Sequence, residues 1–172
     1  SRGLGDVYKR QIADRAKLMW LNYPNNPTGA VATKAFYEKL VAWAKTYEVG
    51  VVSDLAYGAL GYRGYENPSF LSTPGAKDVG IEFYTFSKTF NMAGWRLAFA
   101  AGNEQMIEAL NLIQDHLFVG IFPALQEAGI AALLDPKSEE AVAQLNATYD
   151  GRRDAFVQAA AKIGWQAFPS RG

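Results

Sequence analysis

An alternation of apolar strands and one amphipathic helix restricts the possible folds of this chain most strongly. Residues 17–23 (KLMWLNY) form an apolar run that ends in the turn formers of 24–29, and residues 50–54 (GVVSD) form a β-branched run that ends at an acid. Between them, four residues recur at the spacing of one helix face: Phe36, Leu40, Ala44 and Tyr47. Thr33 can cap that helix. This order is typical of a βαβ unit, so we expect an α/β fold with a mostly parallel sheet and helices on both faces.

The remaining elements follow from similar patterns. We expect an irregular segment over 58–80, strands over 81–87 and 96–101, and helices over 104–118, 123–134 and 135–163. Asp135 and Pro136 supply a cap and a first-turn proline for the last helix. Gly151 favours a bend within it, and Gly164 is a good stop signal.

Composition excludes several classes of site and partner. The 172 residues include no Cys, which excludes disulfides and thiolate chemistry, and the single His116 cannot form a His-based metal site. Lys plus Arg and Asp plus Glu both number 17, so a nucleic acid or anionic membrane is not expected as a partner. These counts lead us to expect no bound metal. We expect no membrane span because no long apolar run is found, and a cytoplasmic location because no signal sequence is found. The chemistry must use Lys, Asp, Tyr, Arg or a cofactor.

The two ends of the chain predict a piece of a longer protein. Residues 1–11 (SRGLGDVYKRQ) fit no helix or strand period and resemble a translated adapter from sequencing libraries, so we interpret them as a non-native segment. Residues 169–172 end the chain without a capped element. We expect the function to belong to the longer protein and the isolated chain to be inactive.

Polar side chains follow three of the predicted strands at the point where each ends. Asn26 follows the first strand, Asp54 ends the second with Tyr57 beyond it, and Lys88 follows the third. The carboxyl ends of parallel strands meet at one sheet edge, so these residues should converge although 28 and 34 residues separate them. A lysine amine is a nucleophile for aldehydes, and an Asp can hold a positive ring nitrogen. Hydroxyl groups with an Arg can hold a phosphate. Together these groups describe a pyridoxal 5′-phosphate (PLP) site.

Three motifs in this order carry a resemblance to a known family. Residues 25–29 (NNPTG), 54–57 (DLAY) and 85–96 (TFSKTFNMAGWR) resemble the class I/II aminotransferases of PLP fold type I. The resemblance implies that Lys88 bonds to PLP and moves the substrate proton, and that Asp54 pairs with the pyridine nitrogen. It implies that Asn26 and Tyr57 bind the ring oxygen. It places the phosphate beside three residues: Thr85, Ser87 and Arg96.

The same resemblance implies a domain division and an activity. Residues 12–134 would be part of the PLP-binding large domain, and residues 135–172 would be a linking helix and the start of the small C-terminal domain. The activity implied is transfer of an amino group between an amino acid and a 2-oxo acid in a homodimer. The sequence looks most like the bacterial methionine-salvage and diaminopimelate subgroup, with aspartate and aromatic aminotransferases still open. A β-lyase and the PLP-binding sensor domain of a transcription regulator are the alternatives.

Overall fold

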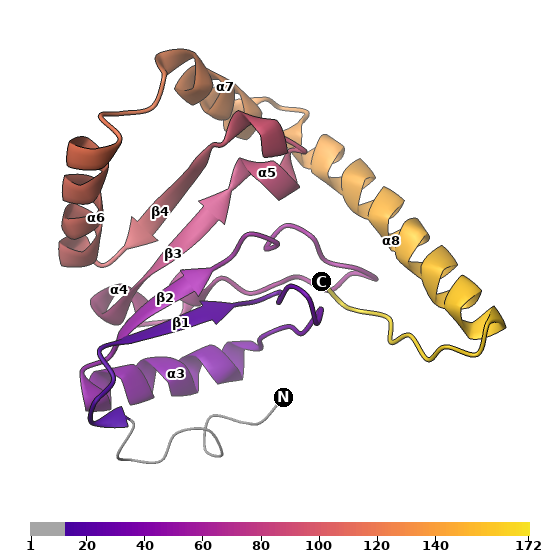
Figure 1. Ribbon diagram of the computed structural model, residues 1–172, viewed down its shortest axis with the longest axis horizontal. Coiled ribbons are helices and arrows are strands. Elements are labelled where there is room, and N and C mark those ends of the chain that lie inside the picture. Colours follow the sequence, from indigo (N-terminus) through magenta and orange to yellow (C-terminus); the bar gives the residue numbers. More distant parts are fainter. Residues whose placement is uncertain (1–12) are drawn as a thin grey trace.

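A mixed sheet forms the centre of the computed structural model, which describes residues 13–172. Within them the strand order is β1 (Leu18–Asn22), β2 (Gly50–Asp54), β3 (Gly80–Thr85) and β4 (Ala98–Gly102). β2 pairs in parallel with β1 and β3, whereas β4 runs antiparallel to β3 (Figure 1). The predicted α/β fold with a mostly parallel sheet is therefore confirmed, with one antiparallel edge strand. The segment predicted to be non-native, 1–11, lies outside the described residues.

The direction of β4 follows from the path of the chain between β3 and β4. Residues 86–97 make this connection, and they fold into two short helices, α5 (Phe86–Thr89) and η2 (Ala93–Trp95). A parallel pair would need a connection that passes back along the sheet. These two helices turn the chain round at the end of β3 instead, so β4 returns beside it.

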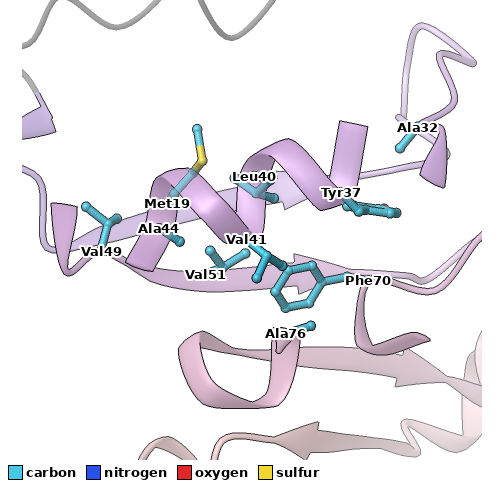
Figure 2. Packing of buried hydrophobic residues seen from close by; sticks show 10 residues of the cluster. All are labelled: Met19, Ala32, Tyr37, Leu40, Val41, Ala44, Val49, Val51, Phe70 and Ala76. Atoms are coloured by element: carbon cyan, nitrogen blue, oxygen red, sulfur yellow. The ribbon is translucent and has the colours of Figure 1, made fainter. Parts of the chain in front are cut away.

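Helix α3 (Lys34–Tyr47) covers one face of the sheet, as the sequence predicts. Thr33 caps it by accepting a hydrogen bond from the Phe36 N–H at 3.1 Å. Leu40 and Ala44 are fully buried against Met19 and Val51 of the sheet (Figure 2). The other members of this core are Ala32, Tyr37, Val41, Val49, Phe70 and Ala76.

A buried carboxylate on the sheet holds part of the segment over 58–80 in place. Glu82 of β3 is only 6% exposed and accepts hydrogen bonds from Ser53 Oγ at 2.9 Å, Ser69 Oγ at 2.5 Å and the Phe70 N–H at 2.8 Å. These bonds attach η1 (Phe70–Ser72) to the middle of the sheet. Apart from η1 and α4 (Ala76–Val79), the segment over 58–80 is irregular, as predicted.

Three helices follow β4: α6 (Glu104–Leu117), α7 (Pro123–Leu134) and α8 (Ser138–Lys162). They complete the arrangement in which helices lie on both sides of the sheet (Figure 1). The bounds of α7 match the prediction, but α8 begins at Ser138 because Asp135 caps the end of α7 instead. The Asp135 carboxylate accepts from the Lys137 N–H at 2.7 Å. The helix is not broken at Gly151, since α8 is continuous through it. Among residues 13–172, no helix has the length and apolarity needed to cross a membrane.

Candidate active site

The loop after β1 is held to the sheet edge by Asn22, the last residue of that strand. Its Oδ1 accepts from the Asn26 N–H at 2.9 Å and from Asn25 Nδ2 at 3.4 Å, while its Nδ2 donates to the Asp54 carbonyl at 3.2 Å. The loop closes on itself because the Gly29 N–H donates to the Asn25 carbonyl at 2.7 Å. Sequence reasoning did not single out Asn22. The sequence feature that could have identified it is an amide side chain at the end of a strand, directly before a turn.

Three of the predicted site residues lie in one cleft. Asn26 Nδ2 donates to the Tyr57 hydroxyl at 3.1 Å, so the loops after β1 and β2 are bonded side chain to side chain. Lys88 Nζ lies 5.7 Å from the centroid of the Tyr57 ring. All three residues line a cleft of about 560 Å³, within the roughly 300–1,000 Å³ typical of small-molecule sites.

Lys88 reaches this cleft from α5 and not from the strand itself. β3 ends at Thr85, two residues before the predicted end, because Thr85 caps α5 by accepting from the Ser87 N–H at 3.1 Å. Lys88 is therefore exposed on a helical turn that follows the strand. Within residues 13–172, no carboxylate forms an ion pair with it. Its amine is open to a reaction partner in the cleft.

The other predicted residues are not on the lining of this cleft; they are Asp54, Thr85, Ser87 and Arg96. Asp54 is half-buried, and its Oδ1 accepts from the Ala56 N–H at 3.1 Å. Its second oxygen has no hydrogen-bond donor in the described part of the chain. Thr85 also donates to the Leu97 carbonyl at 3.3 Å. Arg96 is exposed, has a left-handed backbone with φ of 53°, and donates to the Ala93 carbonyl at 2.8 Å. The structure thus does not bring Arg96 into the cleft with Lys88.

Part of the cleft wall comes from the C-terminal third of the chain, where the sequence predicted no site residue. Residues 167–172, here called the tail segment, return to the loop after β1 (Figure 1). The lining residues from α8 and the tail segment include Tyr149, Arg153, Phe156, Val157, Phe168 and Ser170. The only sequence signal here is that Tyr149 and Phe156, seven residues apart, fall on one face of the helix predicted over 135–163. No periodicity marked Arg153.

The chemical groups of the site are consistent with a small carbonyl compound that carries a heteroaromatic ring. The cleft offers a primary amine, a phenol hydroxyl and a carboxamide, and the unpartnered Asp54 oxygen lies at the end of the adjoining strand. A neutral amine can attack an aldehyde, and a carboxylate can hold a protonated ring nitrogen.

Comparisons with known proteins show the family of this chain. The family model for aminotransferase class I and II matches residues 3–172. The chain is 56% identical over 155 residues to the L-glutamine–4-(methylsulfanyl)-2-oxobutanoate aminotransferase of Bacillus subtilis, covering 90% of this chain and 38% of that protein. It is 49% identical over 154 residues to the LL-diaminopimelate aminotransferase of Moorella thermoacetica, covering 90% and 39%.

A solved structure agrees in fold. The substrate-bound BacF structure from Bacillus subtilis superimposes with a TM-score of 0.92 at 48% identity, covering 97% of this chain and 42% of that one. The chain therefore spans about two-fifths of the length of the relatives that it matches. With the family model matched almost from end to end and three of its motif residues gathered in one cleft, this chain belongs to the class I and II aminotransferases.

Proposed function

We propose that this chain carries the cofactor-binding part of a PLP-dependent aminotransferase, which moves an amino group between an amino acid and a 2-oxo acid. The observation that supports this most is the meeting of Asn26, Tyr57 and Lys88 in one cleft from three separate segments. When bound, PLP supplies an aldehyde carbon and an electron sink for the substrate α-carbon.

The residues of the chain have separate tasks in this proposal. Lys88 Nζ would hold the cofactor covalently and would then move a proton at the substrate α-carbon, because a neutral amine serves both as nucleophile and as base. Tyr57 and Asn26 would donate hydrogen bonds to the ring oxygen, and their mutual bond holds the two side chains together. Asp54, which has one unpartnered carboxylate oxygen, would pair with the ring nitrogen and keep it protonated.

The phosphate is assigned to residues at the end of β3. Thr85 and Ser87 offer hydroxyl groups there, and Arg96 follows Lys88 by eight residues. For Arg96 this requires the guanidinium to leave the Ala93 carbonyl, to which it donates at 2.8 Å, and to turn toward the cofactor. An exposed side chain makes this change at little cost, because water replaces the lost bond.

Substrate class and assembly belong to the same proposal. The methionine-related and diaminopimelate activities of the relatives favour an amino acid and a 2-oxo acid of that subgroup as substrates. The apolar residues that α8 and the tail segment add to the cleft suit the carbon chain of such a substrate. We place the enzyme in a homodimer, as is typical of the family.

The test uses a chimaera, in which the aligned residues of this chain replace their counterparts in the Bacillus subtilis aminotransferase. Incubation with PLP should give a visible absorbance band that borohydride traps, with the label on the peptide that contains Lys88. Lys88→Ala should abolish the band. Lys77→Ala, which removes an exposed lysine on α4 away from the cleft, is the matched control and should keep it.

Product analysis then identifies the reaction. An aminotransferase converts the 2-oxo acid into a new amino acid, whereas a β-lyase releases a fragment of the donor side chain. A chimaera that forms no visible band, or a Lys88→Ala variant that keeps the band, would overturn the assignment of Lys88.

A further inference from the structure

One arginine of α8 lies where three segments of the cleft wall meet. The side chain of Arg153 is only 10% exposed, and its guanidinium pairs with Asp150 at 2.5 Å and Asp154 at 2.7 Å. The same group lies 4.9 Å from the centroid of the Tyr62 ring and donates to the Ser170 carbonyl at 3.1 Å. Each of the three guanidinium nitrogens thus has a partner within the protein.

The tail segment is held by two neighbouring carbonyl groups. Arg153 binds the carbonyl of Ser170, and the Tyr62 N–H donates to the carbonyl of Arg171 at 3.0 Å. Since the guanidinium also lies against the Tyr62 ring, one residue pair holds both carbonyls. The tail segment is thereby attached to α8 and to the loop after β2 at the same place.

Further bonds fix α8 to that loop. Arg63 donates to both oxygens of Asp154 at 3.1 Å, and Asn146 Nδ2 donates to the Ala59 carbonyl at 2.7 Å. Asn146 and Arg153 are seven residues apart, which is two helical turns, so both lie on the face of α8 that meets the loop. Arg153 is the member of this face that also reaches the tail segment.

The tail segment in turn contacts the loop that carries Asn26. A Cβ added at Gly29 would lie 2.6 Å from Ser170 Cβ, and one added at Gly172 would lie 2.6 Å from Pro24 Cγ. At these two glycines, the tail segment and the loop after β1 therefore lie too close together for a larger residue without a local shift. A displacement of the tail segment would open the cleft on the side of Asn26.

We propose that Arg153 is a positioning residue that holds the tail segment as a preformed wall of the substrate side of the cleft. The inference rests on the proposed aminotransferase function. The planar, multiply donating guanidinium suits this task, because it bonds to two carboxylates and one carbonyl while it stacks on a ring. A wall that is ordered before the substrate arrives lowers the entropy lost on binding, so its loss weakens substrate binding.

The experiment compares Arg153→Ala, Arg153→Lys and Arg152→Ala in the chimaera. Arg152 is the matched control, because it is the preceding, exposed arginine of the same helix and is not on the cleft lining. Its guanidinium lies over the ring of Tyr149 of the same helix and not against the tail segment. Steady-state kinetics separate KM from kcat for the amino donor. Hydrogen exchange of the Tyr62 amide reports on the tail segment directly, since that amide donates to the Arg171 carbonyl.

Arg153→Ala should raise KM about tenfold with kcat changed less than about twofold, because it removes binding that ground and transition states share. It should speed exchange of the Tyr62 amide at least about tenfold, because local opening becomes easier. Arg153→Lys should lie between wild type and Arg153→Ala, and Arg152→Ala should match wild type. The visible PLP band should be the same in all four proteins.

Several results would overturn the inference. They are an unchanged KM, a loss of kcat alone, an unchanged Tyr62 exchange rate, or an equal effect of Arg152→Ala. If Arg153→Ala does not fold, wild-type values in Arg153→Lys would overturn it instead. A failure of the proposed function looks different, because the unmodified chimaera would then lack the PLP band while the Tyr62 exchange still tests the wall.

Discussion

Replacement of Glu82 tests whether a buried carboxylate holds the irregular segment between β2 and β3 to the sheet. Glu82 accepts three hydrogen bonds, and two of its donors belong to residues with almost no exposure: Ser53 is 1% exposed and Phe70 is 0% exposed. Glu82→Leu keeps a similar volume but removes every acceptor. Glu82→Gln keeps one acceptor oxygen for the Ser53 and Phe70 donors, and its amide can donate to Ser69 Oγ.

The two variants should differ clearly in the free energy of unfolding. Each buried donor left unpaired costs about 1–3 kcal/mol. The Leu variant no longer has the cost of burying a carboxylate, which offsets part of this loss, so Glu82→Leu should lower the free energy of unfolding by about 3–4 kcal/mol. Glu82→Gln should cost about 1 kcal/mol, because hydrogen bonds to a neutral acceptor are weaker than those to a charged one. The Leu variant should therefore unfold at a urea midpoint about 1 M lower, for a slope of about 3 kcal/mol/M.

Urea unfolding of the chimaera, followed by far-ultraviolet circular dichroism, provides the assay. Glu66→Gln is the matched control, because Glu66 is an exposed glutamate of the same irregular segment, and its replacement should change stability by less than about 0.5 kcal/mol. If Glu82→Leu proved as stable as Glu82→Gln, the Ser53 and Phe70 donors would have other partners and the reasoning would be refuted.

Four shorter predictions concern other parts of the molecule. Thr33→Ala removes the cap of α3 and should lower stability by about 1 kcal/mol in urea unfolding of the chimaera. Gly102→Ala places a Cβ 2.4 Å from the Gly80 carbonyl oxygen at a φ of 137°, so it should lower the free energy of unfolding by about 2 kcal/mol or more, and wild-type stability would contradict this clash. Burial, with the nearby Glu82 carboxylate, raises the pKa of the Tyr37 hydroxyl, so the folded state holds this proton more tightly than the unfolded state does. The resulting stabilisation is fully present below the unfolded pKa of about 10 and is lost as the pH rises above it. Tyr37→Phe should therefore reduce the fall in urea midpoint between pH 8 and pH 10.5. The isolated 172-residue chain should self-associate in sedimentation, because it exposes large apolar side chains such as Phe118 at 65%, and a cooperative melt of a monomer would contradict this.

Much of the fold could be predicted because its local signals agree with its tertiary contacts. Helical spacing and the Thr33 cap located α3, and β2 matched its predicted bounds. The errors arose where a side chain bonded to a different neighbour from the one expected. Thr85 ended β3 early by capping α5, and Asp135 capped a turn after α7 instead of starting α8.

The buried carboxylate could not be predicted in the same way. The run over 81–87 reads as an apolar strand with one acid in it, and nothing local shows that Glu82 faces inward. Its donors come from Ser53, 29 residues away, and from the Phe70 backbone, 12 residues away. Only the folded arrangement supplies them together.

The candidate site also has a part that the sequence order predicts and a part that it does not. Asn26, Tyr57 and Lys88 each lie within four residues of the end of a strand, so the order of strands in the sheet was enough to predict that they meet. The wall built on Arg153 depends instead on bonds between residues 87 and 91 positions apart, which no local pattern marks. Loss of the contacts of α8 should therefore disturb the wall while the three residues at the sheet edge stay in place. Cofactor binding and substrate binding are thus expected to respond to different substitutions in this chain.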